Sequence, residues 1–128
     1  MTTGILYREE LNDKGFHAQL VITGVERSIL PDIVILLFRV VQETLRNIVG
    51  HAQATKVIVR VRFARKRIKV IIFDNGRGFE PPKELSDFAS QGKLGLLSMN
   101  ERVRLFGGTL SIKSRLGKGT EVNIELKT

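Results

Sequence analysis

The feature that most constrains the fold is how closely two pairs of β-rich segments follow each other along the chain. Residues 57–63 and 68–73 are separated only by Ala64–Arg67, and residues 110–114 and 120–126 only by a glycine-containing turn. Parallel neighbours need a crossover of a dozen or more residues, whereas antiparallel neighbours need only a short hairpin. Each pair is therefore predicted to form an antiparallel hairpin, which excludes a doubly wound parallel sheet.

One further strand and two helices complete the predicted order. Residues 16–22 alternate enough to indicate a strand. Residues 32–50 carry apolar side chains at helical spacing behind a proline and an acidic residue, which are signals of a helix start. Residues 96–106 form the second predicted helix, which Gly107–Gly108 ends. The predicted apolar stripe of the first helix consists of Val34, Leu37, Phe38, Val41, Leu45, Ile48 and Val49.

This order predicts the fold class. We expect an α+β, two-layer sandwich with a mixed, mostly antiparallel sheet of about five strands and helices on one face. A chain of 128 residues makes one ordinary domain, which we place at residues 15–128, after an N-terminal linker or helix remnant at residues 1–14.

Composition narrows the classes of function. Cysteine is absent, which excludes a disulfide scaffold, a thiol nucleophile and a cysteine zinc site. The sequence has neither a signal-peptide pattern nor an apolar run long enough to span a bilayer. We therefore expect a cytoplasmic location, which also fits the cytoplasmic part of a membrane protein. The net charge of +8 attracts anions but does not choose among nucleic acid, nucleotide, acidic lipid and acidic protein.

On the long helix, a carboxylate, an amide and an imidazole share one face. Glu43, Asn47, Gly50 and His51 stand at positions i, i+4, i+7 and i+8, which line up along a helix. Taken alone, this stripe is better explained as the solvated face of an amphipathic helix.

Three glycine-containing segments follow in order. Asp74 ends a β-rich segment, and Gly76 and Gly78 behind it allow a sharp turn and a close approach to a ligand. Residues 92–97 open the second helix and offer free backbone N–H groups to a phosphate. Residues 117–120 turn into the last strand. Each segment taken alone is also an ordinary turn or helix start, and neither a Walker loop nor a GxGxxG fingerprint occurs.

In this order and at this spacing, the segments resemble the ATP-binding catalytic domain of two-component sensor histidine kinases. Residues 38–54 are similar to the N box of the nitrate-sensor and lipid-fluidity-sensor branch. Residues 95–103, followed by Gly107–Gly108, are similar to its second glycine box. The resemblance covers about residues 16–126. It implies a histidine-kinase-type ATPase fold that binds Mg-ATP and donates the γ-phosphoryl group to a histidine on a separate domain.

The resemblance also implies a role for each site residue. Asn47 would bind the Mg²⁺ that bridges the ATP phosphates, and Glu43 would act as the general base. Asp74 would accept a hydrogen bond from the adenine amino group, with Thr120 supporting that contact through water. Residues 79–92 would form the ATP lid. The other implied ATP-binding residues are His51, Gly76, Gly78, Lys93, Gly95, Leu96 and Leu97.

Two positions depart from the family's pattern. Gly50 stands where many relatives carry Lys or Arg, which removes an expected phosphate contact and costs the helix up to about 1 kcal/mol relative to alanine. Lys93 stands where relatives often carry glycine, and we expect it to restore the charge from the lid side. Lys93→Ala should then weaken nucleotide binding in a calorimetric titration more than the loss of a surface lysine elsewhere; equal effects would contradict this role.

The resemblance implies partners as well. In such kinases the phosphoaccepting histidine lies on a separate helical dimerisation domain, so His51 is not that histidine and the chain alone should not phosphorylate itself. A response regulator would receive the phosphoryl group. We expect this chain to be monomeric and the full-length protein to be a homodimer.

Two other functions remain open. A stand-alone kinase of the anti-sigma-factor type would phosphorylate a serine on a partner, and the short chain favours it slightly. A non-catalytic basic module would bind nucleic acid or a protein partner. Side chains alternate between the two faces of a strand, which places several basic residues of the 57–73 hairpin on its solvent side. We therefore prefer to interpret them as a solvated hairpin, and we expect no nucleic acid partner. The basic residues concerned are Arg60, Arg62, Arg65, Lys66, Arg67 and Lys69.

Overall fold

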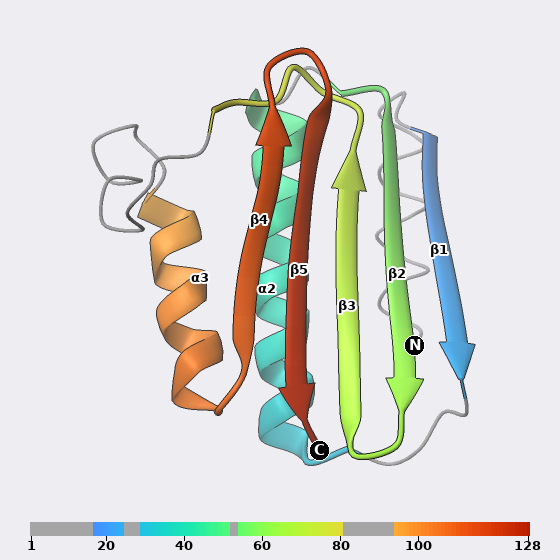
Figure 1. Cartoon of the computed structure of the whole chain (residues 1–128), viewed down its shortest axis with the longest axis vertical. Helices are drawn as coiled ribbons and strands as arrows, with labels where there is room; N and C mark the ends of the chain where they lie inside the picture. Colours follow the sequence, from blue (N-terminus) through green and yellow to red (C-terminus); the bar gives the residue numbers. More distant parts are fainter. Residues whose placement is uncertain (1–16, 25–28, 52–53, 81–93) are drawn as a thin grey trace.

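The structure, a computed structural model, describes residues 17–24, 29–51, 54–80 and 94–128. Five strands and two helices lie in these ranges (Figure 1). Neither described helix is both long enough and apolar enough to cross a membrane. The elements are β1 (His17–Gly24), α2 (Pro31–His51), β2 (Lys56–Ala64), β3 (Arg67–Asp74), α3 (Leu94–Leu105), β4 (Thr109–Arg115) and β5 (Gly119–Lys127).

The strands form one mixed sheet in the order β1-β2-β3-β5-β4. β1 pairs with β2 in parallel, and the 21-residue helix α2 provides the crossover that a parallel pair needs. The other three pairs are antiparallel, and the β2–β3 and β4–β5 pairs are the two predicted hairpins. The predicted α+β fold with a mixed, mostly antiparallel sheet is therefore confirmed.

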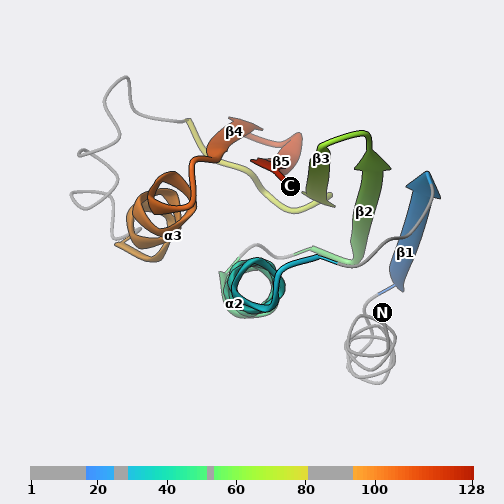
Figure 2. The same cartoon turned by 90° about the horizontal axis from the view of Figure 1, so that it is seen from below.

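Both helices lie on the same side of the sheet (Figure 2). Alternate strand residues point toward them, so the inner face is aliphatic, and Ile124, Leu126 and Val103 are fully buried there. Each large aliphatic side chain removed from water in this way contributes about 1.5–3 kcal/mol. The buried strand residues in this core are Ala18, Val57, Val61, Phe63, Ile68, Val70, Ile72, Val122, Ile124 and Leu126.

The buried face of α2 differs from the predicted stripe. Ile33, Leu36 and Val40 are buried, whereas Val34 and Phe38 are 50% and 39% exposed. The reason is that residues 33–38 are apolar without interruption, so their sequence does not set the rotation of the helix about its axis. Packing against the sheet sets it instead.

Later in α2 the prediction holds better. Leu45 and Ile48 are buried, and Leu37 and Val41 are partly buried against the core. Thr44 is also buried, because its hydroxyl donates to the Val40 carbonyl at 2.8 Å and is thereby satisfied inside the helix.

Helix α3 begins and ends earlier than predicted. It starts at Leu94, so Gly95 lies in its first turn instead of before it. It ends at Leu105, and Gly107 follows with φ +76° while the Gly108 N–H bonds the Val103 carbonyl. This is the glycine-dependent helix end that the sequence predicts.

Candidate functional site

The segments that carry the predicted site residues meet at one end of the molecule. Helix α2 and strand β3 both end there, β5 begins there, and α3 starts beside them (Figure 1). The antiparallel pairing of β3 with β5 places the end of one strand against the start of the other. Four segments distant in sequence can therefore contribute to one site.

The central residue of this site is Asp74. It is only 3% exposed, at a position of β3 where the preceding inward residues, Ile68, Val70 and Ile72, are aliphatic. Its Oδ1 accepts a hydrogen bond from the Gly76 N–H at 2.8 Å. Burial raises the pKa of the Asp74 carboxyl above the ordinary 3.8, and the Gly76 hydrogen bond opposes that rise with a smaller effect.

The second carboxylate oxygen of Asp74, Oδ2, differs from Oδ1 in its hydrogen bonding. Within the part of the chain that the structure describes, no group donates to Oδ2. Buried polar atoms normally have hydrogen-bond partners, and a buried carboxylate is costly without them. Asp74 therefore has the properties of an acceptor for a donor that arrives with a ligand.

Two hydroxyl groups follow Asp74 across the inner face of the sheet, one on each of the next two strands. Thr120 on β5 is its direct partner in the β3–β5 register, and Ser114 on β4 is the partner of Thr120 in the β4–β5 register. The Oγ atoms of Ser114 and Thr120 are 2.9 Å apart. Sequence reasoning missed Ser114, although the hairpin pairing of residues 110–114 with 120–126 would have placed it opposite Thr120.

Two glycines, Gly78 and Gly119, allow a close approach between the β4–β5 turn and the end of β3 with the loop that follows it. Gly78 has φ +63°, and a Cβ there would lie 2.1 Å from the Arg115 carbonyl oxygen. Gly119 has φ +84°, and a Cβ there would lie 2.0 Å from the carbonyl oxygen of Asp74. The backbone therefore crosses the β4–β5 turn so closely that only glycine fits at these two positions.

Asn75 fixes the loop from the opposite side. Its Oδ1 accepts the N–H groups of Thr55 and Lys56 at 3.0 and 2.8 Å, and its Nδ2 donates to the Thr55 hydroxyl at 3.1 Å. These bonds hold the start of β2 against the end of β3. In the sequence, Asn75 is part of an Asp-Asn-Gly segment that is typical of a turn, so its hydrogen bonds to the start of β2 were not predicted.

The remaining predicted site residues are described to different extents. Glu43 is partly exposed on the C-terminal half of α2. The backbone of Asn47 and His51 lies in the same helix, but the structure does not describe their side chains. Lys93 lies outside the described residues altogether. Gly95, Leu96 and Leu97 are in the first turn of α3, where backbone N–H groups have no acceptor within the helix.

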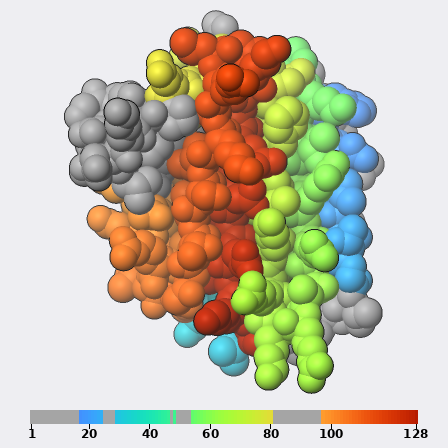
Figure 3. All heavy atoms as spheres, in the orientation of Figure 1, coloured from blue at the N-terminus to red at the C-terminus, as the bar shows by residue number. Residues whose placement is uncertain are grey.

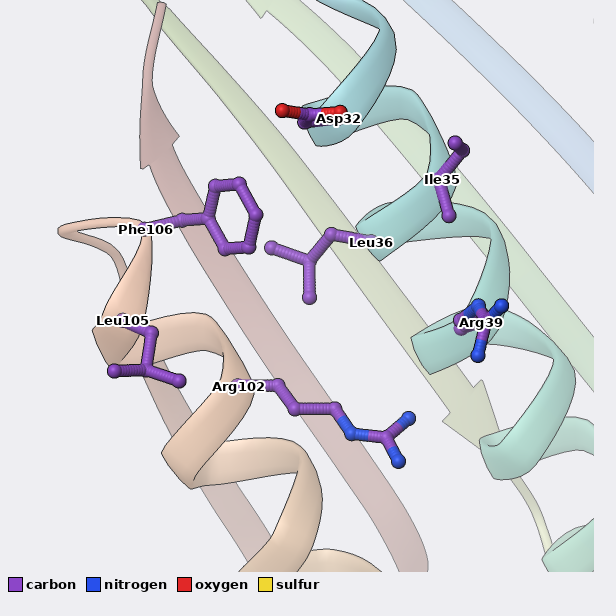
Figure 4. Close-up of a pocket in the computed structure, with 7 residues that line it drawn as sticks. All are labelled: Asp32, Ile35, Leu36, Arg39, Arg102, Leu105 and Phe106. Carbon is purple, nitrogen blue, oxygen red and sulfur yellow. The ribbon is translucent and has the colours of Figure 1, made fainter.

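A separate cavity lies away from this site. It has a volume of about 260 Å³ and opens between the first half of α2 and the last turn of α3 (Figure 4). Phe106 and Leu36 face each other across it, and Arg39 and Arg102 flank it (Figure 4). Among the predicted site residues whose side chains the structure describes, none lines this cavity.

The basic hairpin belongs to the other face of the sheet. Arg60 and Arg62 are exposed on β2, on the side away from the helices, and Arg67 pairs with Glu125 at 2.8 Å. Figure 3 views this open face, at which the β2–β3 hairpin projects from one end of the sheet. These residues do not contribute to the site around Asp74.

The raised pKa of Asp74 has a consequence for stability. Below pH 3.8 the Asp74 carboxyl is protonated, and therefore neutral, in both the folded and the unfolded chain. As pH rises through the folded-state pKa, the buried carboxyl must become charged, and the free energy of unfolding falls. At neutral pH the buried charge is therefore a cost. Asp74→Asn should raise the Tm of the ligand-free chain by a few degrees at pH 7, and by less as the pH is lowered toward 4.

Thermal unfolding followed by circular dichroism between pH 4 and 8 checks this expectation. Asp32→Asn is the matched control, because Asp32 is an exposed acidic residue in the first turn of α2. It should leave Tm unchanged or lower it slightly. A lower Tm for Asp74→Asn at pH 7 would contradict a destabilising buried charge.

Comparison with known proteins places this geometry in a family. The model of the family described as histidine kinase-, DNA gyrase B-, and HSP90-like ATPase matches residues 32–128. The structure adds β1, which pairs with β2, so the folded unit extends to residue 17.

Individual relatives are bacterial signalling kinases. The signal transduction histidine-protein kinase/phosphatase DegS of Bacillus subtilis is 34% identical over 92% of this chain and 30% of its own length. The sensor histidine kinase LiaS of the same organism is 36% identical over 70% of this chain and 24% of its own length. The chain thus spans about a third or less of these curated relatives.

Solved structures share the fold. ShkA, crystallised full-length in complex with AMPPNP, superposes with a TM-score of 0.77 at 21% identity, over 98% of this chain and 28% of ShkA. The histidine kinase domain of the blue-light activated kinase EL346 from Erythrobacter litoralis gives 0.68 at 22% identity, over 97% of this chain and 57% of that one.

Proposed function

Since the chain belongs to the histidine kinase-, DNA gyrase B-, and HSP90-like ATPase family, we propose that it binds Mg-ATP at the Asp74 end of the sheet. We propose further that it donates the γ-phosphoryl group to a histidine on a separate domain. Asp74 carries the proposal, because it is a buried carboxylate with one oxygen held by Gly76 and the other without a described donor.

The chemistry of Asp74 favours adenine over guanine. The exocyclic amino group of adenine donates hydrogen bonds, whereas guanine has a carbonyl oxygen at the same ring position. A carboxylate pairs with the donor and repels the carbonyl. A site whose buried polar atoms hydrogen-bond one group of a ligand discriminates strongly against a ligand that lacks this group. The reason is that the polar atoms of the site would then be buried without a partner.

The phosphates would meet the first turn of α3. The N–H groups of residues 94–96 have no acceptor within the helix, and the positive end of the helix dipole lies there. A helix N-terminus with such free amides favours phosphate. The N-terminus of α3 is assigned this role together with Asp74, because β3 ends on the same side of the molecule as α3 begins (Figure 1).

Helix α2 would supply the remaining groups. Asn47 would hold Mg²⁺ through its amide oxygen, a hard ligand, with phosphate oxygens and water completing the coordination. Bound Mg²⁺ would neutralise charge on the phosphates. Glu43, one helical turn earlier on the same face, would accept the proton of the attacking group or orient that group.

Calorimetric titration tests the nucleotide site. Mg-ATP should bind the chain saturably, and Mg-GTP should bind at least tenfold more weakly. The second nucleotide is the control for nonspecific attraction to the +8 charge, since both carry the same phosphates. Equal affinities would reject adenine recognition, and no heat at millimolar Mg-ATP would reject the site.

We propose that the acceptor histidine and the response regulator belong to other domains or chains, and that the reaction takes place in the cytoplasm. The chain alone should then incorporate no alkali-stable label from [γ-³²P]ATP, and adding a histidine-bearing dimerisation domain of a related kinase should restore labelling. Glu43→Gln should slow that labelling about a hundredfold or more, the usual contribution of a general base.

Glu121→Gln is the matched control for that assay. Glu121 lies on the outer face of β5, where its carboxylate bonds Asn123 and not the site. It should leave the labelling rate unchanged. Strong self-labelling of the chain alone would contradict a separate acceptor, and equal rates for Glu43→Gln and wild type would remove Glu43 from the mechanism.

A further inference from the structure

Ser114 has three polar neighbours around one hydroxyl group. Its Oγ accepts the Phe79 N–H at 2.8 Å and donates to the Gly119 carbonyl at 3.0 Å. The Thr120 Oγ1 lies 2.9 Å away as the third neighbour. Ser114 thereby connects the loop after β3, the β4–β5 turn and the inner face of β5.

Counting protons settles the direction of the Ser114–Thr120 bond. A serine hydroxyl has one proton and two lone pairs. The carbonyl of Gly119 can only accept, so it takes the proton of Ser114, and the Phe79 N–H can only donate, so it occupies one lone pair. The remaining lone pair faces Thr120, so Thr120 must be the donor in this bond.

The consequence concerns the side of Thr120 that faces Asp74. With its only proton directed at Ser114, the Thr120 hydroxyl can offer a ligand, or a bridging water, nothing but lone pairs. Its register partner Asp74 offers a carboxylate oxygen. The pair is therefore an all-acceptor surface, which suits a ligand edge that donates and is unfavourable for one that accepts.

We propose that Ser114 is a positioning residue that sets the proton of Thr120 and thereby makes the site select an amino group over a carbonyl at position 6 of the purine. This inference rests on the proposed binding of a nucleotide. Without Ser114, the Thr120 hydroxyl is free to rotate and can donate to a carbonyl.

The experiment compares Mg-ATP with Mg-ITP, whose purine carries a carbonyl at position 6 and, unlike guanine, no amino group at position 2. Dissociation constants are measured by calorimetry for wild type and Ser114→Ala. Wild type should prefer ATP strongly. Ser114→Ala should weaken ATP binding by about three- to tenfold and bind ITP at least as well as wild type does, so the preference for ATP falls by about threefold or more.

A structural role alone predicts a different result. If Ser114 merely holds the loop, its loss weakens both nucleotides by the same factor and leaves their ratio unchanged, which would overturn the proposal. Ser114→Thr keeps the hydroxyl and should retain the wild-type ratio. Should Ser114→Ala not fold, Ser114→Cys fills the same space with a weakly bonding thiol and serves the same comparison.

The two proposals fail in distinguishable ways. Absence of ATP binding by wild type would reject the nucleotide site itself. Normal ATP binding with a strong preference over ITP, and an unchanged preference in Ser114→Ala, would reject only the role of Ser114. Thr120→Val removes the lone pairs in question and should weaken ATP at least as much as Ser114→Ala does.

Discussion

Replacing Asp74 by asparagine is expected to remove most of the affinity for Mg-ATP, by at least about tenfold and up to about a hundredfold. A hydrogen bond to a charged group contributes about 1.5–3 kcal/mol, and each 1.4 kcal/mol is a factor of ten in affinity. The amide also presents an N–H₂ group to the base, and two donors that face each other cannot bond.

The fold should survive this change. The Oδ1 of the new side chain can still accept the Gly76 N–H, which is the only described hydrogen bond of the Asp74 side chain. The same variant is expected to gain thermal stability at neutral pH, since a buried charge is lost. Lost binding together with a higher Tm separates a functional residue from a structural one.

Calorimetry of Mg-ATP with wild type, Asp74→Asn and Asp32→Asn measures the effect. The control removes a charge of the same sign from an exposed position at the other end of α2, so it should bind ATP as wild type does. Wild-type affinity in Asp74→Asn would show that the base does not meet this carboxyl and would move the nucleotide site elsewhere.

Replacing Gly119 by alanine is expected to destabilise the fold by about 3 kcal/mol or more. An added Cβ would lie 2.0 Å from the backbone carbonyl oxygen of Asp74, and φ is +84°. The left-handed conformation costs about 1–2 kcal/mol for a residue with a Cβ, and forcing additional atoms into a packed region costs about 1–3 kcal/mol. The contact is with backbone, so β3 and β5 must move apart.

Gly117→Ala is the matched control, two residues earlier in the same turn. Gly117 has a similar φ of +78°, but a Cβ there meets nothing within 4 Å. It should cost only the conformational term of about 1–2 kcal/mol. Urea denaturation of both variants gives the difference directly, and equal losses would show that the close approach of β5 to Asp74 is not required.

Gly119→Ala should also weaken ATP binding in whatever fraction stays folded. Moving β5 away from β3 shifts Thr120 relative to Asp74, since the two are direct register partners. Gly117→Ala should keep wild-type affinity, because the added Cβ meets nothing within 4 Å and leaves β5 in place. The pair of variants thus separates stability lost through the backbone conformation from geometry lost at the site.

The sequence alone determined the fold class because the signals for it are local. Two short connections forced antiparallel hairpins, and the helix predicted at residues 32–50 separates the first predicted strand from these hairpins. Helical and alternating patterns repeat within a few residues, so they can be recognised without knowledge of the partner elements. The family resemblance depends on the same linear order of motifs.

Tertiary structure decided the rotation of α2 and the contents of the site. The uninterrupted apolar run at 33–38 fits several rotations, and only packing against the sheet selects one. The pairing of Asp74 with Thr120 and the hydrogen bond from the Phe79 N–H to Ser114 join residues far apart in the chain. Sheet register creates such neighbours, and register between β3 and β5 follows from how their aliphatic faces pack together rather than from either strand's own sequence.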